Sequence, residues 1–329
     1  MPRPRPRPSW SDALTPPILV RDVARLDPDD VRDVLAVLRA ASAGDGVRPV
    51  SEETELRLQH GGPPGGRDLV VRRPSGKLAG YARLDDGQAE LVVAPEFRRQ
   101  GVGSALLTRL EELAGSGPLS VWAHGDLPGS GELAASRGYD RARVLLQMRR
   151  DLAGVDADPR PPLPDGVRVQ AFRPSIDEAA WLRVNARAFA AHPEQGSWTA
   201  EDLRLREEEP WFDPAGFLLA WRADGVRLGS RGEPQPASLV GFHWTKVHPP
   251  GDVGPGAVGE VYVLGVDPDA QGLRLGRALT DLGLAHLRER GLAEVLLYVE
   301  EDNVAAVRLY EGRGFGRHSV DVSWRRLPS

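Results

Sequence analysis

Two short turns in the chain combine glycine and arginine in a way that suits an anion. One is "VDPDAQGLRLGRALT" (266–280) and the other is "VAPEFRRQGVGS" (93–104); each follows an apolar run and precedes an amphipathic segment. Glycine in such a turn lets backbone N–H groups point in one direction. Together with the positive end of the following helix they form a site for a phosphate or pyrophosphate. A loop in which glycine only allows close packing is the alternative, and the second copy favours the binding site. Neither GxxxxGK[ST] nor GxGxxG occurs, so a P-loop or Rossmann site is not predicted.

The turns belong to a longer internal repeat. Pro95 matches Pro268 at an offset of 173, and Tyr139 in "ASRGYD" matches Phe315 in "EGRGFG" at an offset of 176. A nearly constant offset over this distance indicates a duplicated domain. We predict a basic, proline-rich disordered tail at 1–16, a first domain at 17–150, a linker at 151–166 and a second domain at 167–329.

The elements that must hold the turns follow the same order in both halves. An amphipathic helix (27–42; 175–190) precedes three strands (68–73, 77–84 and 88–94; 216–223, 237–246 and 259–266). A helix follows each turn, and then come a strand (119–124; 294–300), a short helix and a last strand. Strands that first form a meander and later alternate with helices predict an α/β (α+β) fold, in which each domain is a mixed, mostly antiparallel sheet flanked by helices.

Composition limits the partners. The 329-residue chain is 41% hydrophobic with no apolar run of transmembrane length, so we expect a soluble protein without a membrane partner. The net charge is −5 and no segment is consistently basic, which argues against nucleic acid. There is no cysteine, which is compatible with the cytoplasm, and the histidines lack metal-ligand spacing. Lys77 and Lys246 are the only lysines among 42 basic residues.

Two signatures resemble those of the GCN5-related N-acetyltransferase (GNAT) family. The first is V-x-P-x-x-[RQ]-x-x-G-x-G leading into a helix, and the second is "DNVAAVRLYEGRGF" (302–315). The second half departs from the first signature, with Arg274 where the first half has Gly101. We expect Gly272 to supply the missing conformational freedom instead.

The resemblance implies acetyl-CoA as co-substrate, with one site in each domain and no metal. In the family, the strand before the turn pairs with the pantetheine arm and the amides of the turn hold the pyrophosphate. In the second half the implied residues are Leu264, Gly265, Val266, Gln271, Gly272, Leu273, Arg274, Leu275, Gly276, Arg277, Asn303, Val304, Ala305, Ala306, Val307 and Arg308. In the first half they are Leu91, Val92, Val93, Arg98, Arg99, Gln100, Gly101, Val102, Gly103 and Ser104.

Acetyl transfer to an amine needs a neutral amine, a donor for the carbonyl oxygen and a proton for the departing thiolate. Tyr310 lies five residues before Phe315, where the family commonly has the tyrosine that protonates the thiolate. The matching first-half residue is Ala134, which can donate nothing, so we expect the first half to bind the cofactor but to be catalytically silent. Glu260 begins the strand before the turn and, by the same resemblance, removes the proton of the amine directly or through water. The alternatives are a half-buried packing aromatic for Tyr310 and an exposed edge residue for Glu260.

Longer stretches resemble one tandem branch of the family, whose substrate is the cysteinyl amine of cysteinyl-glucosaminyl-inositol. They are "FAAHPEQGSWTAEDL" (189–203), "EPWFDPAGF" (209–217), "GFHWTKVHPP" (241–250), "GEVYVLGVDP" (259–268) and "LLYVEEDNVAAVRLY" (296–310). The resemblance implies these substrate-binding residues: Glu194, Lys246, Glu260 and Tyr298 in the second half, and Glu52 from the first half. A polyol with an ammonium group suits carboxylates, a lysine and aromatic faces. The arginine-rich composition fits a GC-rich actinobacterial genome.

Two other functions stay open. One is a GNAT enzyme that acetylates another small amine or a peptide N-terminus, and the more remote one is a sensor that binds acetyl-CoA without turnover. Tyr310 argues against the sensor. We expect a monomeric cytoplasmic enzyme with a small-molecule substrate.

Overall fold

The computed structural model describes residues 18–61, 65–152, 162–222 and 238–327. The predicted tail at 1–16 and most of the predicted linker lie outside these ranges. The strands are β1 (Val20–Val23), β2 (Arg67–Arg72), β3 (Leu78–Asp85), β4 (Gln88–Val93), β5 (Leu119–Ala123), β6 (Asp140–Asp151), β7 (Val167–Ala171), β8 (Phe217–Arg222), β9 (Ser238–His248), β10 (Val258–Val266), β11 (Glu294–Glu300) and β12 (Gly316–Arg326). The helices are α1 (Pro28–Asp45), α2 (Glu52–His60), α3 (Val102–Ala114), α4 (Pro128–Ser136), α5 (Glu178–Ala188), α6 (Pro193–Gly196), α7 (Ala200–Glu207), α8 (Leu275–Glu289) and α9 (Val304–Glu311).

Every helix and strand predicted from the repeat is present. The first strand of each half, β1 and β7, and the helices α2, α6 and α7 were not predicted. Two of these helices carry a start signal in the sequence. The Ser51 side chain accepts a hydrogen bond from the backbone of Thr54, and Thr199 and Asp202 form a reciprocal capping box. Capping residues followed by acidic first turns could therefore have revealed α2 and α7.

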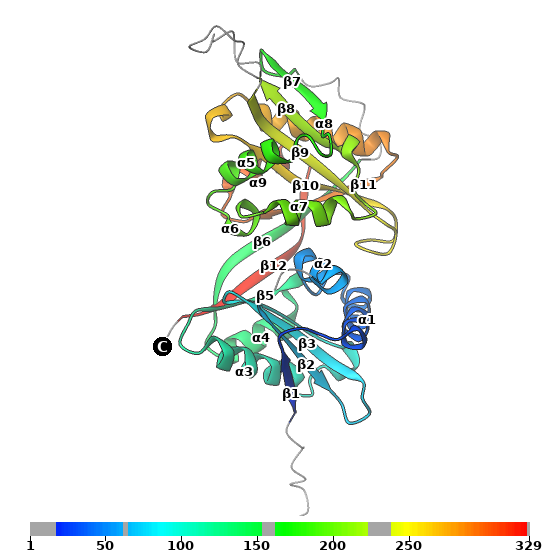
Figure 1. Cartoon of the computed structure of the whole chain (residues 1–329), viewed down its shortest axis with the longest axis vertical. Coiled ribbons are helices and arrows are strands. Elements are labelled where there is room, and N and C mark those ends of the chain that lie inside the picture. The colour runs from blue at the N-terminus through cyan, green and yellow to red at the C-terminus, as the bar shows by residue number, and fades with distance from the viewer. Residues whose placement is uncertain (1–17, 62–64, 153–161, 223–237, 328–329) are drawn as a thin grey trace, which may run out of the picture.

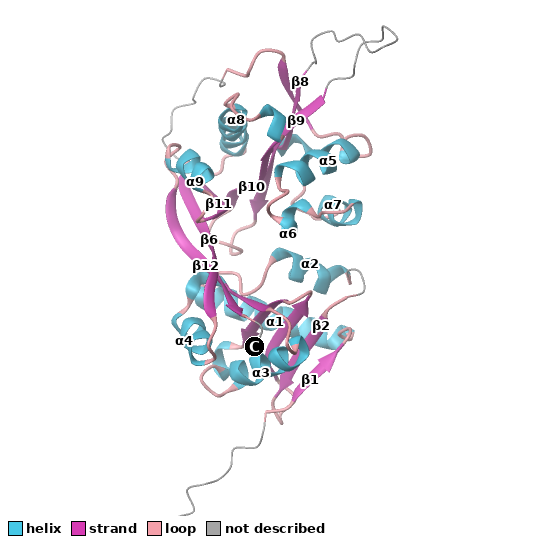
Figure 2. Cartoon of the chain, turned by 90° about the vertical axis from the view of Figure 1, so that its left-hand side faces the viewer, coloured by secondary structure: helices cyan, strands magenta, loops and turns pink. Residues whose placement is uncertain are grey.

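The described strands form one continuous sheet in the order β1-β2-β3-β4-β5-β12-β6-β11-β10-β9-β8-β7. Figure 1 shows two lobes, one above the other, with β6 and β12 running between them. Within each lobe the first strands are antiparallel, and the strand before the glycine turn pairs in parallel with the strand after it, β4 with β5 and β10 with β11. Helices cover both faces of the sheet, and α2 of the lower lobe faces α6 and α7 of the upper lobe in both views (Figure 2).

The two halves exchange their last strands. The strand β12, which ends the second half, pairs with β5 of the first half, and β6, which ends the first half, pairs with β11 of the second. These two strands also pair with each other along most of their length. Hydrogen bonding between the lobes therefore passes through the middle of the sheet, and each half of the sequence completes the sheet of the other.

The core is divided between the faces of the sheet. In the first lobe, α3 packs on one face around Leu106 and Leu110, and α1 packs on the other around Val34 and Leu38. In the second lobe an aromatic cluster centred on Trp244, which stacks on Phe217 at 4.3 Å, lies under α5. Burial of side chains this large is worth about 1.5–3 kcal/mol each, so both faces of each lobe hold the strands of the site in place.

Candidate active site

In both lobes the two parallel strands separate just before the glycine turn. The strand β4 pairs with β5 only as far as Glu90, opposite Trp122, and β10 pairs with β11 only as far as Val261, opposite Leu297. Beyond these points, within the described part of the chain, β4 and β10 stay paired only on the other side, with β3 and β9. The backbone of 91–93 and of 262–266 therefore faces an opening in the sheet, as expected for a strand that pairs with an extended ligand.

The opening in the first lobe is a cavity of about 950 Å³. Eight of the ten first-half residues predicted to bind the cofactor line it: Leu91, Val92, Val93, Arg98, Arg99, Gly101, Gly103 and Ser104. Val102 is buried in the core instead, and the side chain of Gln100 is bonded to Arg73. A cavity of this volume is within the range of ordinary small-molecule sites.

The two turns have the same backbone conformation with glycine and arginine interchanged. Arg99 and Gly101 in the first half have φ values of 58° and 82°, and Gly272 and Arg274 in the second have 83° and 60°. Each turn therefore contains two residues in the left-handed conformation, and one of the two is an arginine. Holding an arginine in this conformation costs about 1 kcal/mol or more of folding free energy. The expectation that Gly272 would supply the freedom missing at position 274 was wrong, because Arg274 itself adopts the left-handed conformation.

The helices that follow the turns start without a side-chain cap. The N-cap residues Gly101 and Arg274 make no side-chain cap on α3 and α8, as is also the case for α4 and α5, whereas Asp27, Ser51, Thr199 and Asn303 cap α1, α2, α7 and α9. The first amides of α3 and α8 are therefore available to an anion, as the resemblance requires. In the second turn Gln271, Gly272, Leu273, Arg274 and Arg277 are exposed, Gly276 is half-buried and Leu275 is buried in the core. On the strand before it, Leu264 and Val266 are half-buried and Gly265 is buried.

The short helices α4 and α9 confirm that Ala134 and Tyr310 are equivalent positions. The backbone N–H of Tyr139 donates to the carbonyl of Ala134, and the N–H of Phe315 donates to the carbonyl of Tyr310, both at 3.1 Å. Ala134 lines the first-lobe cavity. Tyr310 is 7% exposed, and its ring meets that of Phe315 edge-on at 5.7 Å. Burial raises the pKa of the Tyr310 hydroxyl, which therefore stays protonated.

The remaining residues of the second signature differ in exposure. Asn303 caps α9 by accepting a hydrogen bond from the backbone of Ala306 at 3.2 Å. Val307 packs in the core with Tyr310. Val304, Ala305 and Arg308 are exposed, and Ala306 is half-buried.

Three of the predicted substrate residues come together at the junction of the lobes. Lys246 of β9 lies directly opposite Glu260 of β10, so the two side chains share one face of the sheet. Glu52, the first residue of α2 in the other lobe, forms an ion pair with the Lys246 ammonium. Burial alone would raise the pKa of Glu52, but Lys246, with the Tyr262 hydroxyl and Arg206, lowers it to about 2, so the Glu52 carboxylate is charged.

Aromatic rings and an arginine surround this ion pair. The Tyr262 hydroxyl donates to Glu52 at 2.6 Å and accepts from Arg206 at 2.8 Å. The Lys246 ammonium lies 4.3 Å from the centre of the Trp211 ring, within the range of a cation–π contact. The sequence did not single out Tyr262, Arg206 or Trp211, because nothing in their spacing links them to Glu52.

Tyr298 and Glu194 are the other two predicted substrate residues. Tyr298, which is 36% exposed, accepts a hydrogen bond from Gln147 of the exchanged strand β6 at 2.7 Å. Burial, the Glu260 carboxylate and the Asp321 carboxylate raise the pKa of the Tyr298 hydroxyl. Glu194 belongs to α6, but its side chain lies outside the described part of the structure.

Glu260 is itself half of a buried pair. Its side chain is 9% exposed, and His248 Nε2 lies 2.6 Å from Glu260 Oε2. The strand pairing agrees that Glu260 and Glu90 are not counterparts. Glu90 lies opposite Trp122, and the repeat offset of 176 matches Trp122 with Tyr298. A counterpart of Glu90 would therefore lie opposite Tyr298, whereas Glu260 lies opposite Leu296.

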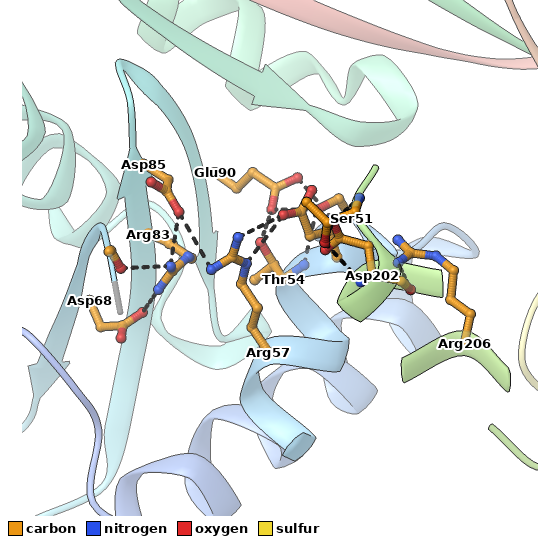
Figure 3. Close-up of polar contacts among 12 residues, drawn as sticks. Ser51, Thr54, Arg57, Asp68, Arg83, Asp85, Glu90, Asp202 and Arg206 are labelled. Carbon is orange, nitrogen blue, oxygen red and sulfur yellow. Dashed lines mark hydrogen bonds and ion pairs between the residues drawn. The ribbon is translucent and has the colours of Figure 1, made fainter. Parts of the chain in front are cut away.

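In the first lobe the carboxylate at the opening, that of Glu90, is hydrogen-bonded to other protein groups. Glu90 accepts hydrogen bonds from the backbone and hydroxyl of Ser51 (2.8 and 3.0 Å) and from Thr54 (2.6 Å), and Figure 3 shows these side chains pointing toward one another. His124, which lines the cavity, lies between Glu90 at 3.1 Å and Asp321 of β12 at 3.0 Å. Burial would lower the pKa of His124, but Asp321 and Glu90 raise it to about 10. The first lobe thus has neither a tyrosine at position 134 nor an unengaged carboxylate at this position.

The described residues also bear on membranes and metals as partners. None of the described helices is both long and apolar enough to cross a membrane. Within the same ranges, no three histidine, aspartate or glutamate side chains are grouped to hold a metal ion.

Comparison with known proteins identifies the family. Residues 181–315 match the Acetyltransferase (GNAT) family and residues 65–139 match the Acetyltransferase (GNAT) domain. A mycothiol acetyltransferase from Geodermatophilus obscurus is 71% identical over 94% of this chain and 98% of its own length. A mycothiol acetyltransferase from Thermobispora bispora is 53% identical over 93% and 99%.

A solved structure has the same tandem architecture. The tandem GNAT protein from the clavulanic acid biosynthesis pathway has a TM-score of 0.68, is 22% identical and covers 94% of this chain and 99% of its own. At this identity the likeness concerns the fold alone. Together with the two family matches, it confirms the predicted fold of two GNAT-like domains with mixed sheets flanked by helices.

Proposed function

The chain belongs to the mycothiol acetyltransferases, GNAT enzymes that use acetyl-CoA, and on that premise we propose its reaction. The second lobe transfers the acetyl group to the cysteinyl amine of 1D-myo-inositol 2-(L-cysteinylamino)-2-deoxy-glucopyranoside, which yields mycothiol and CoA. The observation that carries the proposal within the molecule is the grouping of Glu52, Lys246 and Glu260 at the junction of the lobes. A substrate with one cation and many hydroxyls matches this set of charged and hydrogen-bonding groups.

Glu260 accepts the proton of the amine, directly or through water. Its Oε2 is engaged by His248, which leaves Oε1 for the amine or the water. An α-amine with a pKa of about 8 is mostly protonated at neutral pH and cannot attack a thioester until the proton is removed. The neutral amine attacks the acetyl carbonyl, and Tyr310 gives its proton to the departing CoA thiolate. Support for Tyr310 is its equivalence to Ala134, which lines a cavity at the corresponding place in the first lobe.

Each lobe binds one acetyl-CoA and only the second lobe turns over. For the first lobe the support is the cavity, and for both lobes it is the shared turn conformation with uncapped helix starts. Glu194 and Tyr298 complete the substrate site. The enzyme acts as a monomer in the cytoplasm, since Glu52 reaches the second-lobe site within one chain and a protein without cysteine needs no oxidising compartment.

The reaction is tested by measuring CoA release with a panel of amines. Cysteinyl-glucosaminyl-inositol is expected to give the highest kcat/KM, ahead of glucosaminyl-inositol, simple amines and a peptide with a free N-terminus. Equal efficiency with simple amines or the peptide would contradict the substrate and leave a general GNAT acetyltransferase. The absence of turnover with every amine, despite binding of acetyl-CoA, would support the sensor instead.

Replacing Glu260 by glutamine is expected to lower kcat by about 100-fold at neutral pH, since the base is lost while the size of the side chain is kept. The loss should shrink as pH rises, because a growing fraction of the amine is then neutral in solution. The measurement is kcat and kcat/KM against pH for wild type and Glu260→Gln, since kcat/KM reports the ionisation of the free amine. Parallel profiles would make Glu260 a binding residue rather than a base.

Replacing Lys246 by alanine is expected to raise KM for the amine by about 10- to 150-fold, the value of a lost hydrogen bond to a charged group. KM for acetyl-CoA should change little. Because Glu52 would be left buried without its partner, the variant is compared with Glu52→Gln/Lys246→Ala, in which no charge is stranded. If KM for the amine stays at the wild-type value in the double variant, Lys246 does not bind the substrate.

A further inference from the structure

A chain of charged groups runs from the first lobe to Glu260, with Arg48 and Asp252 half-buried and His248 and Glu260 buried. Arg48, in the segment between α1 and α2, donates from Nη2 to Asp252 Oδ2 at 2.5 Å. The same Asp252 oxygen lies 2.7 Å from His248 Nδ1, and His248 Nε2 lies 2.6 Å from Glu260 Oε2. Asp252 belongs to the connection between β9 and β10, and Arg48 is the contribution of the other lobe.

His248 is the centre of this chain. Its side chain is 2% exposed, and each of its ring nitrogens faces a carboxylate. A ring with an acceptor at both nitrogens is fully bonded only as an imidazolium, which has two N–H donors. Burial and the nearby Lys246 ammonium lower the pKa of His248, but Asp252 and Glu260 outweigh them and raise it. His248 thus has two carboxylates beside it, Asp252 and Glu260. Two cations are also near: Lys246 on the same strand, and Arg48, whose Nη2 is 3.5 Å from His248 Nδ1.

We propose that Arg48, Asp252 and His248 are positioning residues for Glu260, with Arg48 supplied by the catalytically silent lobe. The inference rests on the proposed function of Glu260 as the base. His248 holds one carboxylate oxygen of Glu260, so the other is directed to the amine in a single orientation. Asp252 fixes the imidazolium from the far side, and Arg48 fixes Asp252. Positioning of a reacting group by hydrogen-bonded partners commonly decides its efficiency, because a small displacement of that group is costly.

The role of the first lobe follows from this geometry. The silent lobe contributes Glu52 to the substrate site, and four residues earlier, before α2 begins, it contributes Arg48 to the support of the base. Both contacts cross between the lobes. A second lobe produced alone would thus retain Glu260 and Tyr310. It would lose Arg48, which holds Asp252, and Glu52, which pairs with Lys246.

The primary test is Asp252→Asn, which keeps the shape of the side chain and removes its charge. We expect kcat to fall by about 10- to 100-fold, as for loss of a hydrogen bond between charged groups, with KM for acetyl-CoA unchanged. The loss should grow as the pH rises, because His248 with only one carboxylate neighbour has a lower pKa than in wild type and becomes neutral at a lower pH. Arg48→Lys should keep more activity than Arg48→Met, since it retains the charge.

Asp29→Asn is the matched control, the same change at a side chain on α1 that is 78% exposed and paired only with a neighbouring arginine. Thermal unfolding is recorded for each variant to exclude loss of the folded protein. Nitrogen-15 NMR of the His248 ring gives a readout that needs no turnover: two protonated nitrogens at neutral pH in wild type, and titration at lower pH in Asp252→Asn.

The outcomes separate the two hypotheses. An active wild type with Asp252→Asn parallel to it at every pH, or with a loss explained by unfolding or by a raised KM for acetyl-CoA, would overturn the positioning role. A neutral His248 ring in wild type at neutral pH would overturn it as well. A wild type inactive on the cysteinyl amine would contradict the proposed function instead, while the NMR measurement still decides whether the imidazolium is held by two carboxylates.

Discussion

Replacing Tyr310 by phenylalanine is expected to lower kcat by about 100- to 10,000-fold, the range for removal of a positioned general acid. The ring of the variant can keep its edge-on contact with Phe315 and its place in the core, so the fold should persist. What is lost is the hydroxyl, which burial keeps protonated until the CoA thiolate forms.

The effect is measured as kcat for the cysteinyl amine together with the dissociation constant of acetyl-CoA by calorimetry. Tyr81→Phe is the control, because it removes another buried hydroxyl, one bonded to Asp68 in the core of the first lobe. It should cost stability without changing kcat. Wild-type turnover in Tyr310→Phe would exclude Tyr310 as the acid and leave it as a packing aromatic.

Replacing Gly276 by glutamate should reduce kcat/KM by about 100-fold or more. The new carboxylate would lie in the first turn of α8, where the amides are proposed to hold the pyrophosphate, and like charges brought together cost several kcal/mol. The variant Gly276→Ala shows whether the loss in Gly276→Glu comes from the added charge or from the added side-chain volume. A Cβ at this position would meet only Val266 Cγ2, at 3.7 Å, which is an ordinary contact, so the alanine variant should remain active.

The equivalent change in the first lobe, Gly103→Glu, tests whether that lobe is silent. A Cβ there would have similar room, with its nearest neighbours Leu133 and Val93 at 3.6 Å. Calorimetry should find two acetyl-CoA sites in wild type and one in each glutamate variant, with turnover retained only in Gly103→Glu. Loss of catalysis in Gly103→Glu while the second site is still occupied would mean that the first lobe does more than bind cofactor.

The sequence by itself determined the repeated elements, the turns and the difference between the two halves. Each depends on residues close together in the chain. Apolar periodicity predicted α1, α3, α5 and α8, and a count of five residues from an aromatic was enough to match Ala134 with Tyr310. The substrate residues were obtained differently, since Glu52 and Lys246 came from resemblance and not from any property of their spacing.

Only the tertiary structure decided how the site is assembled across the lobes. The exchange of β6 and β12 has no signature in either strand, because a strand with the same alternation of side chains can pair with any compatible edge. Glu52 meets Lys246 at a separation of 194 residues, and Arg48 meets Asp252 at 204. Pairs so distant leave no periodic pattern, and their energies depend on burial and on partners that exist only once the chain has folded. For the same physical reason, His248 was visible in the sequence only as one of several scattered histidines, and its place between Asp252 and Glu260 comes from the fold.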